Sequence, residues 1–240
     1  MPRQLLTWSD TIKGTYPQRL PEPLHKTAMT YSYLHQVNMD SLNQVIENAE
    51  LRARLSAKLS KTYSDDDQDS FKTPTASVLI PMLLPSSSLL PLGEIKILLT
   101  KRTANLSSHK GELVFPGGRL EPGETYAEAA IRETGEEVGL RSVTVLGTLG
   151  SHTTVQNTSF VAVVGVVEDI ENLSPSVSEV EKVLLPSVAQ LISAENYHEE
   201  QWHFAKNVTR SMHFFEVADE LCWGATASLL AQFLELLLHL

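Results

Sequence analysis

The stretch that decides the fold runs from Gly118 to Leu140 and reads GRLEPGETYAEAAIRETGEEVGL. Its second half has the apolar spacing of a helix, which Gly139 ends because glycine readily adopts the left-handed conformation of a helix C-cap. In this helix Glu133, Glu136 and Glu137 are three and four residues apart, so their carboxylates share one face within about one turn. Like charges at this spacing repel one another, and the face therefore requires bulk water or a cation.

The surroundings of these glutamates favour the cation. Hard divalent ions such as Mg²⁺ and Mn²⁺ prefer oxygen ligands from carboxylates and carbonyls. Glycines at 117, 118 and 123 surround the helix entry, where the backbone must bend sharply or approach a ligand closely, and Gly118 leaves its carbonyl accessible as a metal ligand. Arg132 can hold an acidic residue such as Glu124, or a phosphate, through its planar fork. The pattern predicts a Mg²⁺ or Mn²⁺ site, and a solvated acidic face is the competing interpretation.

The same residues resemble the Nudix box, G-x5-E-x7-R-E-U-x-E-E-x-G-U, in which U is an apolar residue. The chain supplies this pattern in register at Gly118, Glu124, Arg132, Glu133, Glu136, Glu137, Gly139 and Leu140. The one departure is Thr134, which keeps a branched shape, so we expect it to change local packing more than chemistry. The resemblance implies the α/β Nudix fold, an α/β/α sandwich with a mixed β-sheet, and a pyrophosphohydrolase that cuts phosphoanhydride bonds.

The resemblance also implies roles for individual residues. Glu133, Glu136 and Glu137 would bind the metal, and Arg132 would form a supporting salt bridge with Glu124. A water bound to the metal or polarised by a glutamate is the expected nucleophile, because metal ions stabilise charge on the oxygens of a diphosphate. Glu179, in a later loop, is a candidate for an extra metal ligand or a base, and a plain surface glutamate is the alternative.

The substrate is indicated by a second motif upstream of the box. Leu98–Thr103 (LLTKRT), Gly111 and Phe115–Gly118 (FPGG) resemble the motif of the coenzyme A pyrophosphatase branch, L-L-T-x-R-[SA]-x3-R-x3-G-x3-F-P-G-G. Thr103 replaces a smaller residue. Ser107 replaces an arginine, which would be a natural partner for the 3′-phosphate of coenzyme A. The predicted substrate-binding residues are Arg102, Lys101, Phe115 and Gly117.

This resemblance implies hydrolysis of coenzyme A or acyl-CoA to 3′,5′-ADP and 4′-phosphopantetheine. Because the arginine is missing at Ser107, another nucleoside diphosphate derivative, such as ADP-ribose, NADH or a dinucleotide, stays open. A non-catalytic Nudix-fold nucleotide sensor is a third hypothesis, although such a domain has no need of mutually repelling carboxylates.

Composition limits the remaining partners. Acidic residues outnumber basic ones by 29 to 19, the formal net charge is −10, and no long basic tract occurs, which argues against broad nucleic-acid binding. No apolar stretch is long enough to span a membrane. The one cysteine, Cys222, rules out a disulfide framework within the chain and indicates a reducing compartment. We expect a cytoplasmic protein, with an organelle lumen as the alternative, that binds a nucleotide-type small molecule; the sequence also permits a homodimer.

Composition and sequence pattern divide the chain into an N-terminal arm and helix over residues 1–72 and a predicted Nudix domain over residues 73–240. Prolines interrupt the first 38 residues, a helix is predicted over 41–60, and the run Asp65–Asp67 is interpreted as a solvated linker. Strands are predicted at 76–84, 95–101, 112–115, 143–149, 160–167 and 181–185, followed by a hairpin at 198–205 and 212–217 and a helix at 225–238.

Overall fold

The computed structural model of the protein describes residues 25–28, 34, 42–59, 73–84, 88–104, 110–153, 158–167, 170–204 and 208–240. Ser107, the run Asp65–Asp67 and the boundary predicted at residue 72 lie outside the described residues. Among those that are described, no helix combines the length and the apolar character that crossing a bilayer requires.

A mixed sheet forms the centre of the molecule. Strand β10 (Ser159–Val167) runs parallel to β3 (Ala76–Leu83) and antiparallel to β9 (Val143–Thr153). The outer strands β5 (Lys96–Ile97) and β8 (Gly117–Arg119) pair with opposite ends of β3. Every residue of β10 is buried, as expected for a strand covered on both faces. The mixed sheet predicted from the resemblance is confirmed.

Three smaller sheets surround the central one. Strand β6 (Leu99–Arg102) lies between β11 (Val180–Leu184) and β7 (Leu113–Val114), while β2 (Val45–Glu47) pairs with β4 (Leu89–Pro91). The fourth sheet has the order β1 (His25–Ala28), β12 (Tyr197–Phe204), β13 (Val208–Val217) and β14 (Glu220–Cys222). Its centre is the predicted hairpin. The short helices η2 (Leu92–Glu94) and α5 (Val188–Leu191) complete the connections.

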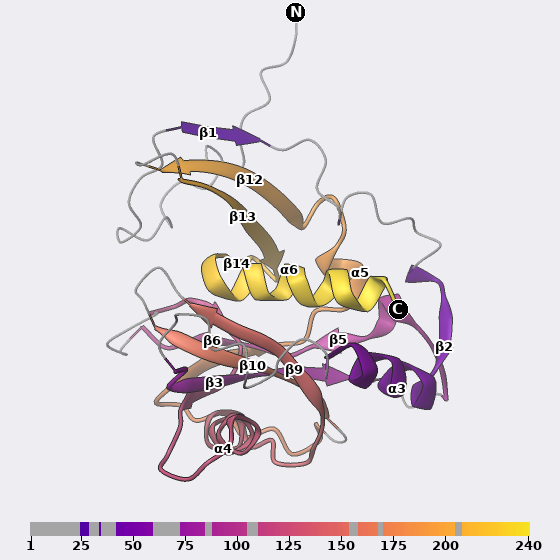
Figure 1. Cartoon of the computed structure of the whole chain (residues 1–240), viewed down its shortest axis with the longest axis vertical. Helices are drawn as coiled ribbons and strands as arrows, with labels where there is room; N and C mark the ends of the chain where they lie inside the picture. The colour runs from indigo at the N-terminus through magenta and orange to yellow at the C-terminus, as the bar shows by residue number, and fades with distance from the viewer. Residues whose placement is uncertain are drawn as a thin grey trace, which may run out of the picture.

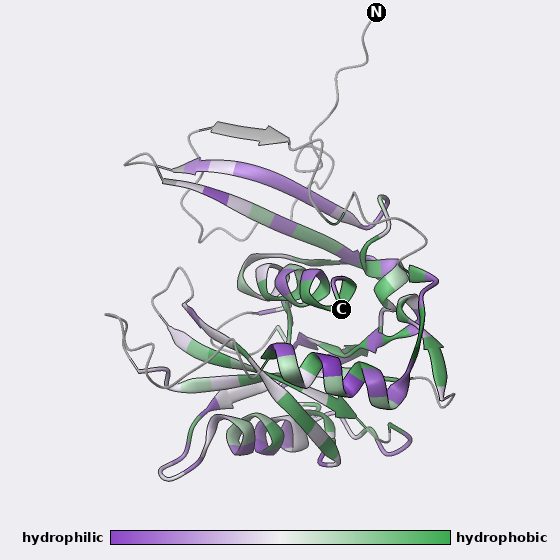
Figure 2. Ribbon diagram, turned by 45° about the vertical axis from the view of Figure 1, so that its right-hand side comes forward, coloured by the Kyte–Doolittle hydropathy of each residue, from purple (hydrophilic) through white to green (hydrophobic). Residues whose placement is uncertain are grey.

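Helices cover both faces of the central sheet (Figure 1). Helix α4 (Tyr126–Val138) lies on one face, where Ala130 packs against Leu79, Val161 and Val163. Helix α6 (Gly224–Leu238) lies on the other face, between the central sheet and the β12–β13 hairpin. Buried residues cover most of the α6 surface and leave one exposed stripe (Ala225, Ser228, Gln232 and Glu235), because a helix enclosed on two sides needs a broad apolar face. Figure 2 shows the resulting hydrophobic colouring of α6 and of the strands beneath it.

Helix α3 (Asn48–Leu59) belongs to the same core as α6. It begins later than the predicted residue 41, because residues 45–47 pair with β4 instead of continuing a helix. Leu51, Leu55 and Leu59 are fully buried, and Ser56 Oγ donates a hydrogen bond of 2.9 Å to the carbonyl oxygen of Leu146 on β9. The helix therefore stabilises the domain that follows it in the sequence.

This packing makes a testable prediction for α3. We expect Leu55→Ala to lower the free energy of unfolding by about 2–5 kcal/mol, because it leaves a cavity in the common core. Leu89→Ala is the control, since Leu89 is 53% exposed, and it should cost less than about 1 kcal/mol. Urea denaturation of both variants measures the difference. Equal losses would mean that α3 does not contribute to the core.

Candidate active site

Caps at both ends fix the position of α4. At the N-terminus the Thr125 hydroxyl accepts a hydrogen bond from the backbone N–H of Glu128 (3.3 Å), and the Glu128 carboxylate accepts one from the backbone N–H of Thr125 (2.8 Å). At the C-terminus Gly139 adopts the left-handed conformation with φ of 81°, and its N–H donates to Gly135. Such caps contribute about 1 kcal/mol each and set the helix register. The glutamates consequently face one direction.

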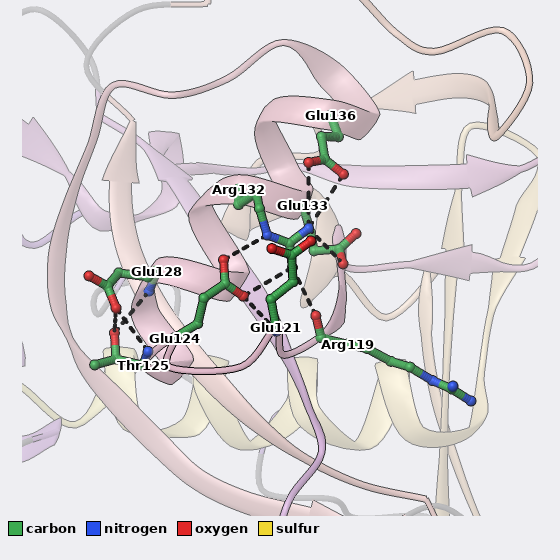
Figure 3. Close-up of polar contacts among 8 residues, drawn as sticks. All are labelled: Arg119, Glu121, Glu124, Thr125, Glu128, Arg132, Glu133 and Glu136. Carbon is green, nitrogen blue, oxygen red and sulfur yellow. Dashed lines mark hydrogen bonds and ion pairs between the residues drawn. The ribbon is translucent and has the colours of Figure 1, made fainter.

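Arg132 connects this helix to the loop that precedes it (Figure 3). Its Nε and Nη2 donate to the two carboxylate oxygens of Glu124 at 2.7 and 3.1 Å, and Nη2 also donates to the carbonyl oxygen of Arg119 at 2.8 Å. Its Nη1 lies 3.1 Å from Glu133 and 3.4 Å from Glu136. The hydrogen bonds from Arg132 lower the pKa of Glu124. All three guanidinium nitrogens are therefore occupied.

Glu133 is held directly against the loop backbone. A Cβ built on Gly118 would overlap the carboxyl carbon and both carboxylate oxygens of Glu133. Only glycine leaves room for this approach, which explains physically why the pattern needs glycine at residue 118. Burial raises the pKa of Glu133, and its contact with Arg132 partly opposes that effect.

Glu137 is the most buried carboxylate of the group, at 3% exposure. Its Oε1 lies 3.5 Å from Nη1 of Arg102, and the backbone N–H of Gly117 also donates to this carboxylate. Among the described residues its Oε2 has no hydrogen-bond partner. Burial raises the pKa of Glu137 to about 7, even though Arg102 favours the charged form. A buried oxygen without a partner is unusual and indicates a place for a ligand.

Glu179 reaches the cluster through a loop that docks on the end of α4. The backbone N–H of Ser176 donates to the carbonyl oxygen of Glu137 at 2.8 Å, and that of Ser174 donates to Val138 at 2.9 Å. The charge of Glu179 raises the pKa of both Glu133 and Glu137, which shows its proximity to them. The sequence identified Glu179 but not this docking, which depends on the packing of distant segments and has no local signal.

Glu136 is the most exposed of the three glutamates predicted to bind the metal. Its side chain is 55% exposed and turns toward Arg132. Among the described residues no three His, Cys, Asp or Glu side chains already converge on one point. The donor set nevertheless fits a hard divalent cation, since carboxylates outnumber guanidiniums around the buried Oε2 of Glu137. Residues that could hold it are Glu133, Glu136, Glu137, the Gly118 carbonyl and Glu179.

Two predicted substrate-binding side chains are engaged elsewhere. Lys101 Nζ lies 2.9 Å from Glu181 and 2.8 Å from Glu220, linking β6 to β11 and β14. Phe115 is 4% exposed and packs in the main core. A substrate role for either residue stays a prediction. The sequence did not predict the contact of Arg102 with Glu137, nor the use of the Arg119 carbonyl by Arg132.

Thr134 occupies the position where the pattern has an aliphatic residue. Its side chain is buried, and its hydroxyl donates to the carbonyl oxygen of Ala130 at 2.6 Å, one helical turn back. The polar atom is thereby satisfied inside the helix without a partner from the sheet.

Comparison with known proteins agrees with this geometry. The NUDIX domain family matches residues 82–208, more than half of the chain. The chain therefore belongs to the Nudix family.

The similar proteins include one named as a Nudix hydrolase and two named as coenzyme A diphosphatases. A Caenorhabditis elegans protein named Nudix hydrolase 3 is 37% identical over 159 residues, which cover 64% of this chain and 61% of that relative. A mitochondrial coenzyme A diphosphatase of Mus musculus is 30% identical over 168 residues, covering 68% of this chain and 77% of the relative. A peroxisomal coenzyme A diphosphatase of the same organism is 29% identical over 185 residues, covering 74% and 71%.

The close approach at Gly118 can be tested by adding one methyl group. Gly118→Ala should displace the Glu133 carboxylate and weaken Mn²⁺ binding by roughly tenfold or more, with the fold retained. Gly135→Ala on the same helix is the control, because its Cβ would meet only the flexible side chain of Arg141. Titration of Mn²⁺ by electron paramagnetic resonance measures both. Equal affinities in the two variants would contradict the assignment.

The raised pKa of Glu137 predicts how the stability of the metal-free protein depends on pH. Since the folded-state pKa, about 7, lies above the ordinary glutamate value of about 4.3, the folded state favours the protonated carboxyl. Stability should therefore fall as pH rises from about 4 to 7. Glu137→Gln removes this penalty and should stabilise the metal-free protein at pH 8 by on the order of 2–3 kcal/mol, with little effect near pH 4. Thermal unfolding in EDTA at both pH values measures it, and a destabilised variant at pH 8 would refute the prediction.

Proposed function

We propose that the protein is a Mg²⁺- or Mn²⁺-dependent Nudix pyrophosphohydrolase that cuts the diphosphate of coenzyme A or acyl-CoA, giving 3′,5′-ADP and 4′-phosphopantetheine. The observation that carries the hydrolase assignment is the pair formed by Glu133, packed on Gly118, and Glu137, whose buried Oε2 has no partner among the described residues. Support for the substrate comes from the motif at Leu98–Thr103 and from the likeness to two mouse coenzyme A diphosphatases.

The side chains of the site have separate roles in the proposed hydrolysis. A divalent cation held by Glu133, Glu136 and Glu137 would neutralise charge that develops on the diphosphate oxygens. Arg132 keeps Glu133 and Glu136 oriented from the same helix, and Glu124 keeps Arg132 in place.

Glu179 is the candidate proton acceptor. Within the described part of the chain its carboxylate makes no ion pair or hydrogen bond, in contrast to Glu124, Glu133 and Glu137. A free carboxylate next to the cluster can take the proton of an attacking water. The proton would pass from the water oxygen to a carboxylate oxygen of Glu179, and the hydroxide oxygen would bond to phosphorus as the phosphoanhydride bond breaks.

The substrate assignment can be tested with a panel of diphosphates. Wild-type protein with Mn²⁺ should release 3′,5′-ADP from coenzyme A, measured by liquid chromatography. ADP-ribose, NADH and a diadenosine polyphosphate should be turned over more slowly. Turnover of ADP-ribose alone would overturn the substrate, and nucleotide binding without any turnover would favour a sensor.

Substitution of individual glutamates tests whether they bind the metal. Glu136→Gln and Glu137→Gln should each lower kcat by roughly 100-fold, on the order of 3 kcal/mol in the barrier, because each removes a charged ligand from the cation. Glu121→Gln is the control, since Glu121 is exposed in the loop before α4 and contributes its backbone to the loop. If either α4 variant keeps wild-type turnover, its glutamate is not a metal ligand.

A further inference from the structure

The two arginines that contact the glutamates of α4, Arg102 and Arg132, differ in how many of their donors are used. Arg132 engages carboxylate or carbonyl oxygens through Nε, Nη1 and Nη2. Among the described residues Arg102 makes one side-chain contact, from Nη1 to Oε1 of Glu137, and its length of 3.5 Å is long for a hydrogen bond. Within the described residues its Nε has no hydrogen-bond partner. Because a guanidinium carries five N–H donors, most donors of Arg102 have no partner in the part of the chain that the structure describes.

The backbone of Arg102 is held by hydrogen bonds on both sides, and its side chain is partly exposed. Its N–H donates to Glu112 at 3.0 Å, its carbonyl accepts from Gly111 at 3.1 Å, and it faces Val180 across the β6–β11 pair. The side chain of Arg102 is 20% exposed, compared with 4% for that of Glu137. The guanidinium therefore lies between a buried carboxylate and the solvent from which a ligand arrives.

Charge balance explains why Arg102 contacts Glu137. A buried carboxylate is costly without a positive partner, and Arg102 is the cation in contact with Glu137. A divalent ion on Glu137 and Glu133 would take over that neutralising role. Arg102 would then carry a surplus positive charge and free donors next to the position of the substrate. The planar fork of arginine binds phosphate oxygens in pairs, so an anionic diphosphate is a suitable second partner.

We propose that Arg102 is a counter-ion that exchanges partners: it holds Glu137 before the cation binds and the phosphate oxygens of the nucleoside diphosphate afterwards. The second half of this exchange rests on the proposed function, which supplies the diphosphate. By linkage, binding of the diphosphate and binding of the cation strengthen each other through Arg102.

The test uses Arg102→Met with Arg119→Met as the matched control. Arg119 belongs to the same site and loses the same charge, but its side chain is exposed and points away from the glutamates (Figure 3). Two affinities are measured on folded, full-length protein: that of Mn²⁺ alone by electron paramagnetic resonance, and that of ADP at saturating Mn²⁺ by calorimetry. Arg102→Met should tighten Mn²⁺ on the order of tenfold and weaken ADP by a similar factor. Arg119→Met should change each by less than about threefold.

An exchange of partners predicts that the same variant, Arg102→Met, binds Mn²⁺ more tightly and ADP more weakly. If Arg102 has a purely structural role, Arg102→Met weakens the binding of both Mn²⁺ and ADP. If the effect is one of charge in general, Arg119→Met changes both affinities as much as Arg102→Met does. Either result overturns the proposal. ADP affinity unchanged in Arg102→Met overturns it as well. Neither measurement requires turnover, so failure of the protein to hydrolyse coenzyme A would refute the proposed function and leave the Mn²⁺ titration valid.

Discussion

The guanidinium of Arg132 is the contact on which the geometry of the site depends. It joins Arg119 at the end of β8 and Glu124 in the following loop to Glu133 and Glu136 on α4, so strand, loop and helix are held together. The bidentate pair with Glu124 has the short distances of charge-assisted hydrogen bonds, which are the stronger kind. Since Gly118 directly precedes Arg119 in β8, this tie also determines how closely the backbone at Gly118 approaches Glu133.

The second feature on which the site depends is the burial of the Glu137 carboxylate, whose charge is only partly compensated by its neighbours. Glu137 lies at the end of α4 that the loop through Ser176 covers and that β6 approaches with Arg102. Desolvation by these neighbours makes its carboxylate a stronger ligand for a cation than an exposed glutamate would be, because the contact of 3.5 Å with Arg102 compensates the buried charge only in part. The core beneath α4, built on Leu79, Ala130 and Val163, keeps the helix from moving away to relieve that cost.

Local features of this protein were predictable from its sequence, while features made by distant segments were not. The bounds of α4 follow from its own caps at Thr125 and Gly139, and most strands follow from short apolar runs. Helix α3 was predicted to begin too early because the pairing of Val45–Glu47 with β4 joins segments more than forty residues apart.

The same limit applies to the site. Spacing along one helix is enough to group Glu133, Glu136 and Glu137, and the Nudix pattern adds Gly118, Glu124 and Arg132. No local signal brings Arg102 to Glu137 or docks the Glu179 loop on the end of α4, because both depend on how β6 and β11 pack beside that helix. The ion pairs of Lys101 with Glu181 and Glu220 likewise join three separate strands.

The enclosed position of α6 has a consequence for how the protein is made. This helix follows every described strand in chain order, yet it fills the space between the central sheet and the β12–β13 hairpin. During synthesis the faces of both sheets that α6 covers therefore stay exposed until the segment around Phe233 has left the ribosome. A nascent chain in that condition is prone to aggregate and is the kind of intermediate that chaperones bind. Helix α4 carries its caps within its own stretch of sequence, but α6, which covers the other face of the central sheet, follows every described strand.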